Sequence, residues 1–303
     1  DDGKVQLPRA EEVQKQLDGL LKTVNDEMST YQKDSEISQF NHNIEANQPF
    51  AISKDFAKVV QEAIRLNKVT NGALDVTVGP LVNLWGFGPD KRLNKVPSEA
   101  QIAERAAVVG IDKFSLVTGD KPTLTKSVKG LYLDLSSIAK GFGVDKLAER
   151  LEQLGVSSYL VEIGGELRGK GNNLQGHPWR IAIEQPNFAQ GESVQIIAPL
   201  HNLGMATSGN YRNYFEDENG NRMSHIIDPS KLSPVSHNLA SITVLAPTTM
   251  TADGLSTGLF VLGPEKALSI AEKEKLAVFL IIKKGDNFET QMSSEFKKLI
   301  EQK

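Results

Sequence analysis

The sequence predicts an α+β fold: a single domain, with one or two lobes, of mixed and largely antiparallel sheet with packed helices. Three observations predict it. Helical and strand-like segments are interspersed along the chain of 303 residues. Several strand-like pairs flank tight turns, which favours antiparallel hairpins over a doubly wound parallel sheet. No internal repeat and no linker rich in Pro, Gly or Ser divides the sequence, so we expect one domain over residues 1–303.

Most of the helices predicted for the N-terminal half have clear ends. Apolar residues recur at helical spacing over Arg9–Met28, and a polar stretch rich in turn formers follows. Ser53 suits the N-cap of a second helix, which we expect to end at Asn71-Gly72 in a left-handed C-cap. A shorter helix is predicted over Ser98–Val109, before Gly110.

The rest of the chain alternates between expected strands and helices. "KFSLVTGDKPTLTK" reads as a hairpin around Gly-Asp, and the short strand "LYLDL" is expected to lead into an amphipathic helix ending at Gly155. A second hairpin is expected around Asn219-Gly220, a helix near Thr251–Val261 and another after Pro264. The remaining strands are predicted at residues 159–163, 179–186, 193–200, 241–247 and 276–284.

The composition narrows the class of protein. The net charge is -4 and no long basic run is present, so nucleic acid is not an expected partner. No apolar stretch is long enough to cross a bilayer. The absence of cysteine excludes disulfides and thiolate metal sites. Because the sequence begins with Asp1 and not with methionine, we expect a processed chain whose signal peptide or lipid-attachment cysteine would lie upstream.

The stretch "DLSSIAKGFGVDKLAERL", residues 134–151, predicts a site for an anion. Helix N-termini attract anions through their free N–H groups, and Lys140 adds a positive charge there. Two glycines in the first turns cost about 1 kcal/mol each against alanine, so we expect Gly141 and Gly143 to let a ligand approach the backbone. Asp134 and Ser137 would stand beside that ligand. The alternative is a capped helix with an exposed lysine; neither the P-loop nor the dinucleotide glycine pattern is present.

Two further motifs carry candidate chemistry. In "TADGLSTGLF", Asp253 and Thr257 are four residues apart and share a helical face. Their oxygens suit Mg²⁺, although an acid in a first helical turn also fits a purely electrostatic role. In "SHIIDP", His225 is a candidate general base, while a structural histidine is the alternative. Trp85, in the glycine-rich run at residues 71–88, either stacks on a flat ligand or packs in the core.

Taken together, these motifs resemble the ApbE family, the FAD:protein FMN transferases. The resemblance rests on "SEISQFN", "GALDVTVGPLVNLWGFG", "DLSSIAKGFGVD", "VEIGGELRGKG", "HIIDP" and "TADGLSTGLFVLG", which follow the family's order from about Met28 to Gly263. It is strongest to the periplasmic lipoprotein members. The resemblance implies an enzyme that takes FAD and Mg²⁺, moves FMN onto a threonine or serine hydroxyl of a target protein and releases AMP. It also implies acceptor subunits of membrane redox complexes, and a periplasmic location with an inner-membrane lipid anchor that this chain lacks.

The resemblance assigns roles to particular residues. Asp253, Thr257 and the backbone oxygen of Ala139 match magnesium ligands, and His225 matches the base that deprotonates the acceptor hydroxyl. Lys140 and the start of its helix, with Asp134, Ser137 and Gly141, would hold the diphosphate. The positions that match contacts with the flavin or adenine, or that would wall the site beside the base, are Met28, Tyr31, Ala73, Leu74, Asp75, Ile227 and Asp228.

One position departs from the family pattern, and two other functions remain open. Leu232 stands where the family usually has a glycine after "HIIDP", so we expect a rebuilt turn there. One alternative function is a Mg²⁺-dependent FAD pyrophosphatase giving FMN and AMP, in which water replaces the protein hydroxyl. The other is a flavin-binding lipoprotein without catalysis. We expect Tyr31 to cover the adenine or flavin side and to slow release, and we expect residues near it to decide the access of water.

Overall fold

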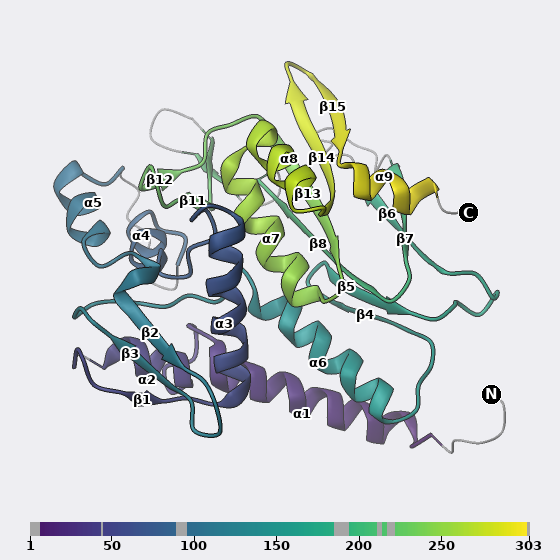
Figure 1. Cartoon of the computed structure of the whole chain (residues 1–303), viewed down its shortest axis with the longest axis horizontal. Helices are drawn as coiled ribbons and strands as arrows, with labels where there is room; N and C mark the ends of the chain where they lie inside the picture. Colours follow the sequence, from purple (N-terminus) through teal and green to yellow (C-terminus); the bar gives the residue numbers. More distant parts are fainter. Residues whose placement is uncertain are drawn as a thin grey trace.

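A six-stranded antiparallel sheet lies at the centre of the protein (Figure 1). The structure is a computed structural model that describes residues 7–43, 45–88, 96–184, 194–210, 214–216 and 222–301. The strand order in this sheet is β15-β14-β13-β8-β5-β4. The strands are β4 (Tyr159–Ile163), β5 (Glu166–Lys170), β8 (Leu203–Gly209), β13 (Leu239–Ala246), β14 (Ala277–Lys284) and β15 (Asn287–Met292).

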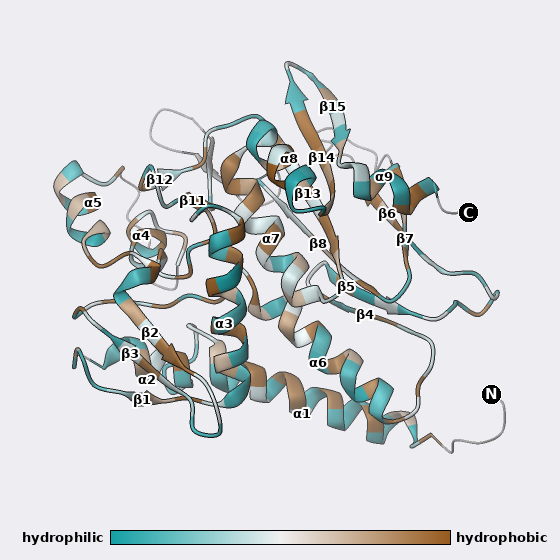
Figure 2. Ribbon diagram, in the orientation of Figure 1, coloured by the Kyte–Doolittle hydropathy of each residue, from teal (hydrophilic) through white to brown (hydrophobic). Residues whose placement is uncertain are grey.

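Strands β13 and β14 are buried on both faces because both faces of the sheet are covered. Along β14, Val278 and Leu280 point into one hydrophobic core, whereas Phe279 and Ile281 point into another. Every residue of β13 is buried. The continuous apolar run of β14, residues 277–282, is typical of a strand buried between two layers, and the brown part of this strand in Figure 2 reflects it.

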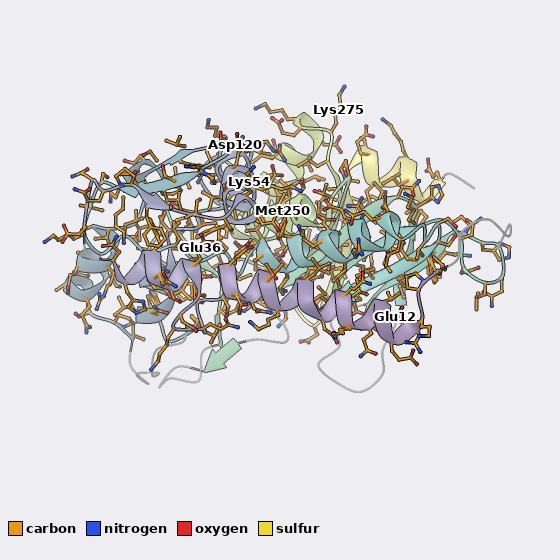
Figure 3. All side chains as sticks on the ribbon, turned by 90° about the horizontal axis from the view of Figure 1, so that it is seen from below. Glu12, Glu36, Lys54, Asp120, Met250 and Lys275 are labelled. Carbon is orange, nitrogen blue, oxygen red and sulfur yellow. The ribbon has the colours of Figure 1, made fainter. Side chains whose placement is uncertain are left out.

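Helices cover one face of the sheet. Helix α7 (Thr249–Leu262) packs against β8 and β13, and it also contacts α6 (Ala139–Gln153) and α3 (Lys54–Val69). Helix α1 (Ala10–Met28) packs on α6 and runs along one side of the molecule, with Glu12 and Glu36 near its two ends in Figure 3. Helix α8 (Pro264–Lys273) comes directly after α7. The other face carries the hairpin of β6 (Trp179–Glu184) and β7 (Val194–Leu200), together with α9 (Ser294–Glu301).

Most of the remaining elements lie on the left side of the molecule in Figure 1, and the others form short hairpins. The second sheet has the order β1-β3-β2 and is antiparallel. These elements are α2 (Glu36–His42), β1 (Phe50–Ala51), α4 (Gly79–Leu84), α5 (Glu99–Ala106), the 3₁₀ turn η1 (Ile111–Lys113), β2 (Phe114–Val117), β3 (Thr123–Lys126), β9 (Tyr214–Glu216), β10 (Arg222–Ser224), β11 (Ile227–Asp228) and β12 (Ser233–Pro234).

The predicted α+β class with antiparallel strands and packed helices is confirmed, and so are the main caps. The Ser53 side chain accepts a hydrogen bond from the Phe56 N–H at the start of α3. Beyond the end of α3, Asn71 has φ 52° and Gly72 has φ 87°, which is the left-handed geometry expected there. The hairpins β2–β3 and β9–β10 also form, although the Asn219-Gly220 turn lies outside the described residues.

Two local expectations were wrong. The polar stretch after Met28 contains a helix, α2, whose N-cap is Ser35. Residues 131–135, "LYLDL", are extended but pair with no strand of the described chain. Several short elements, among them α4, β5, β8, β15 and α9, were not predicted. The single domain over residues 1–303 stays a prediction, and none of the described helices has the length and apolarity that crossing a membrane requires.

Candidate active site

A cavity of about 1040 Å³ brings together residues from sequence blocks that lie far apart. Its wall comes from the first turn of α6, the inner face of α7, strands β5, β6 and β8, and the segments that come after α1, α3 and β10. The residues predicted from sequence that line it are Tyr31, Ala73, Leu74, Asp75, Asp134, Ser137, Lys140, His225, Ile227, Asp253 and Thr257. The fold therefore gathers the two ends of the predicted chemistry, Lys140 and His225, around one space.

Four predicted residues do not line this cavity. Met28 is buried in the main core, two and three positions before the cavity residues Thr30 and Tyr31. Ala139 is partly buried at the start of α6, so only its backbone is a candidate for the site. Asp228 turns away and accepts hydrogen bonds from the Ser230 N–H and hydroxyl, at 2.9 and 2.6 Å. Burial raises the pKa of Asp228, but these hydrogen bonds more than offset it, so that pKa is below its ordinary value.

Gly141 is the fourth residue, and the expectation that it lets a ligand approach the backbone was wrong. It is buried against α7: a Cβ there would lie 2.4 Å from the Thr249 carbonyl oxygen and 2.8 Å from the Asp253 Cβ. A side chain is therefore excluded by the neighbouring helix, not by a ligand. The Gly141 N–H instead donates a hydrogen bond of 2.9 Å to the Asp253 carboxylate. This bond connects the start of α6 to the candidate metal ligand on α7.

A buried acidic pair faces Lys140, the one lysine or arginine that lines the cavity within the described chain. Lys140 Nζ lies 2.8 Å from Glu166 Oε1, with the lysine side chain 47% exposed and the glutamate side chain 5% exposed. The other carboxylate oxygen of Glu166 is buried and has no partner among the described residues. Burial raises the pKa of Glu166. Burial, together with the nearby Glu166 charge, also raises the pKa of Asp253 well above its ordinary value.

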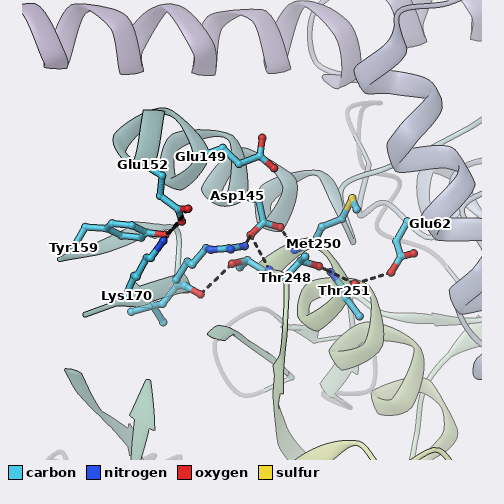
Figure 4. Close-up of polar contacts among 12 residues, drawn as sticks. Glu62, Asp145, Glu149, Glu152, Tyr159, Lys170, Thr248, Met250 and Thr251 are labelled. Carbon is cyan, nitrogen blue, oxygen red and sulfur yellow. Dashed lines mark hydrogen bonds and ion pairs between the residues drawn. The ribbon is translucent and has the colours of Figure 1, made fainter. Parts of the chain in front are cut away.

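The position of α7 depends on Asp145, which the sequence prediction did not single out. One Asp145 oxygen accepts a hydrogen bond of 2.9 Å from the Thr249 N–H, and the other accepts one of 2.8 Å from the Met250 N–H (Figure 4). Arg168 Nη1 lies 2.6 Å from the same carboxylate. A carboxylate suits the free N–H groups and partial positive charge of a helix N-terminus. Asp145 therefore joins α6, β5 and α7, and it fixes the helix that carries Asp253 and Thr257.

Hydroxyl groups surround the second candidate metal ligand. Thr257 Oγ1 lies 3.3 Å from Ser208 Oγ on β8, and that serine lies 2.8 Å from Ser256 Oγ. Ser208 lines the cavity beside Thr257. The Thr257 hydroxyl is thus held at a fixed place on the wall by a neighbour from the sheet.

The histidine and the tryptophan have different surroundings. His225 lines the cavity and packs edge-on against the Phe87 ring, with centroids 6.5 Å apart. Trp85 does not line the cavity. It is buried with Leu81 and Ile227, and its indole N–H donates a hydrogen bond of 3.1 Å to the Leu232 carbonyl. The core interpretation of Trp85 is therefore correct, and the tryptophan stabilises the loop after His225.

The rebuilt turn expected at Leu232, where the family usually has a glycine, stays a prediction. Leu232 has φ 59°, a left-handed conformation that favours glycine and costs about 1–3 kcal/mol for other residues. Its side chain packs against the cluster of Leu81, Trp85 and Ile227. The Leu232 N–H also donates a hydrogen bond of 2.8 Å to the Asp228 carbonyl. The leucine is therefore held in a left-handed backbone conformation by its packing and by this hydrogen bond.

Asp75 and Tyr31 also line the cavity. Asp75 Oδ1 accepts hydrogen bonds from the Thr77 N–H and hydroxyl, at 2.8 and 2.6 Å, while burial raises the pKa of Asp75. Tyr31 is 72% exposed. Its ring is thus available to cover a ligand, and that role stays a prediction.

Sequence reasoning missed Glu166, Ser208 and Asp145. A signal for Glu166 did exist, because "VEIGGELRG" places an acid directly after a Gly-Gly turn with φ of 61° and 100°. This turn joins β4 to β5, so Glu166 is the first residue of β5. Ser208 had no signal, because a serine in a strand of mixed character does not reveal which helix it faces.

The donor set fits a hard cation with few protein ligands. The described residues contain no cluster of three or more His, Asp or Glu that would form a complete metal cage. Asp253 and Thr257 instead offer one carboxylate and one hydroxyl on the same side of α7, at the wall of the cavity. Mg²⁺ is usually bound by one or two carboxylates together with water and ligand phosphates, so this small set suits it. A buried acid whose pKa is raised is also one that a bound cation would bring back to its charged form.

Comparison with known proteins identifies the family. The profile of the ApbE family matches residues 3–280. The chain belongs to the ApbE family. It is 60% identical over its whole length to the FAD:protein FMN transferase of Haemophilus influenzae, of which it covers 87%. It is 50% identical to the enzyme of the same name from Vibrio cholerae, with 94% of this chain and 84% of that protein covered.

Solved structures of the ApbE family have the same fold. The flavin transferase ApbE from Vibrio cholerae superposes with a TM-score of 0.89 at 46% identity, covering 99% of this chain and 93% of that one. The apo form of the Pseudomonas stutzeri flavinyl transferase ApbE has a TM-score of 0.86 at 40% identity, covering 97% and 90%. The structural similarity therefore extends over nearly the whole chain, including the elements that surround the cavity.

Proposed function

We propose that this protein is an FAD:protein FMN transferase that depends on Mg²⁺. FAD binds in the cavity, a threonine or serine hydroxyl of a target protein attacks the phosphorus on the FMN side of the diphosphate, and AMP leaves. The names of the relatives support the transfer of FMN from FAD to protein. The observation that carries the proposal is the gathering of Lys140, Asp253 and His225 around one cavity large enough for a dinucleotide.

Each group has a distinct part in the proposed reaction. Lys140 leaves its pair with Glu166 far enough to contact the diphosphate, for which its 47% exposure leaves room. His225 accepts the proton of the acceptor hydroxyl as the new P–O bond forms, while the bond to the AMP phosphate breaks. Asp253 and Thr257, with the Ala139 carbonyl, would hold Mg²⁺. A bound Mg²⁺ offsets negative charge that develops on the diphosphate.

The target and the location are also part of the proposal. We take the acceptors to be subunits of membrane redox complexes that carry covalent FMN, and the protein to act in the periplasm from an inner-membrane lipid anchor. Both statements rest on the family resemblance alone. Cell fractionation and mass analysis of the mature N-terminus would test the location.

The FAD pyrophosphatase is the second candidate because the same cavity activates the same diphosphate. Here water would take the place of the acceptor hydroxyl. The exposure of Tyr31, which lines the cavity, supports this second function, because the position of its ring would control how much water reaches the phosphorus. The non-catalytic carrier is less well supported, because a carrier has no use for His225, Asp253 and Thr257 at one site.

A mass measurement separates these functions. An acceptor domain with a target threonine is incubated with the protein, FAD and Mg²⁺, with EDTA as control. A mass gain equal to FMN that EDTA abolishes supports transfer. Free FMN and AMP without that gain support hydrolysis, and intact bound FAD supports the carrier. Asp253→Asn is the inactivating variant, and Asp26→Asn, an exposed acid on α1, is its matched control.

A further inference from the structure

The segment of residues 131–135 carries Asp134 into the cavity without support from any strand of the described chain. Its side chains alternate as in a strand, with Leu131, Leu133 and Leu135 fully buried. Asp134 instead points to the cavity. The Asp134 N–H donates a hydrogen bond of 2.8 Å to the Val76 carbonyl. Because backbone polar groups beside a core must be paired, the other partners of this segment decide where it lies.

Asn41 on α2 takes the place of the missing strand. Its side-chain oxygen accepts a hydrogen bond of 2.8 Å from the Leu133 N–H, and its side-chain amide donates one of 2.8 Å to the Leu133 carbonyl. An antiparallel neighbour exchanges the same two bonds with a facing residue. Asn41 and Leu133 are 92 residues apart in sequence, so this contact is tertiary.

The helix that carries Asn41 is itself held in place by hydrogen bonds from Lys126. Helix α2 has only seven residues, too few to be stable alone. The buried Lys126 Nζ donates hydrogen bonds to the Phe40 and Asn43 carbonyls, at 2.7 and 2.8 Å, at the C-terminal end of α2. A cation suits that end of a helix. Asn41 is therefore presented to Leu133 from a fixed backbone.

The residues directly after Leu133 set the start of α6. The Asp134 carboxylate accepts a hydrogen bond of 2.9 Å from the Ser136 N–H, and the Leu135 carbonyl accepts one of 2.8 Å from the Ala139 N–H. The N-cap residue Ile138 offers no side-chain hydrogen bond to α6. The first turn of α6, with Lys140, thus takes its place from the segment before it.

We propose that Asn41 is a positioning residue for residues 134–140, the segment that brings Asp134, Ser137 and Lys140 to the cavity. Through Leu133 it fixes the carboxylate of Asp134 and the start of α6 against the diphosphate of FAD. This inference rests on the proposed function, since it takes FAD as the ligand of the cavity. It also gives a role to the "SEISQFN" block, of which no residue lines the cavity in the described chain.

The test measures FAD affinity separately from stability. The dissociation constant for FAD is measured by flavin fluorescence for the wild type, Asn41→Ala and Asn41→Asp, at a temperature where circular dichroism shows each to be folded. Asn25→Ala is the matched control, because Asn25 also donates a side-chain hydrogen bond to a backbone carbonyl, that of Leu21, but at an exposed position of α1. We expect the constant to rise about tenfold for Asn41→Ala, the effect of one or two hydrogen bonds.

The aspartate variant keeps the acceptor for the Leu133 N–H but sets a second acceptor against the Leu133 carbonyl, so we expect a loss of FAD affinity for it as well, which keeps the argument testable if the alanine variant does not fold. FAD affinity equal to that of the wild type in a folded Asn41 variant, with only the melting temperature lowered, would overturn the positioning role. An equal loss in Asn25→Ala would do the same. A wild type that binds no FAD at all would instead refute the proposed function.

Discussion

The close crossing of α6 and α7 makes a prediction in which two glycines of one helix behave oppositely. Gly141 and Gly143 are both buried on α6. A Cβ at Gly141 would lie 2.4 Å from the Thr249 carbonyl oxygen and 2.7 Å from the Thr249 carbonyl carbon. A Cβ at Gly143 would meet only the Ile163 Cδ1 at 3.4 Å and the Leu21 Cδ2 at 3.7 Å. The first contact is with backbone that cannot rotate away, and the second is ordinary packing.

The magnitudes come from these contacts. Overpacking a core costs about 1–3 kcal/mol, and replacing glycine by alanine inside a helix returns up to about 1 kcal/mol. Gly141→Ala should therefore lower the free energy of unfolding by about 1–2 kcal/mol. Gly143→Ala should raise it by about 0.5–1 kcal/mol. Because the Gly141 N–H donates to the Asp253 carboxylate, separating the helices should also reduce transfer activity in the first variant only.

Urea unfolding of both variants, followed by circular dichroism, measures the two free energies under the same conditions. An unchanged slope with urea concentration would show that the unfolded state is the same in each, so the midpoints can be compared. FMN transfer to an acceptor domain is measured alongside. Equal stability of Gly141→Ala and the wild type would refute the reasoning, because it would mean that α7 can move aside without cost.

Three other predictions concern single positions. Asp253→Asn should abolish Mg²⁺-dependent transfer without lowering the urea midpoint at pH 7, because it removes a buried acid whose pKa is raised; a large loss of stability would contradict this. Burial raises the pKa of Glu27 from 4.5 to about 7, so the wild type should lose stability as the pH rises from about 4.5 to about 7. Glu27→Gln should therefore be more stable than the wild type at pH 8, by about 1 kcal/mol after solvent screening, and no more stable at pH 4, as urea midpoints at both pH values would reveal. Leu232→Gly should be more stable than Leu232→Ala by about 1 kcal/mol and should therefore melt at a higher temperature, because both variants lose the leucine packing and only alanine keeps the cost of φ 59°. A higher melting temperature for the alanine variant would contradict this strain.

Local signals in the sequence were sufficient for most helices and for the hairpins. Ser53 caps α3 as predicted, and the predicted helix after Ser98 forms as α5 with that serine as its cap, because a cap acts through hydrogen bonds to residues three positions away. The apolar run of β14 was recognised as a buried strand because its residues face a core on each side. Such signals failed for α2, whose seven residues depend on Lys126 from a distant strand.

For the candidate site, too, some features could be predicted from local sequence and others could not. The sequence alone identified which residues carry chemistry, since Lys140, His225, Asp253 and Thr257 are indicated by their types, spacing and resemblance to a family. The packing of the folded chain was needed to reveal that Gly141 is a glycine because of α7, that Glu166 opposes Lys140, and that Asn41 supports Leu133. The physical reason is distance along the chain: Gly141 and Asp253 are 112 positions apart, and no local pattern specifies which backbone will pack there.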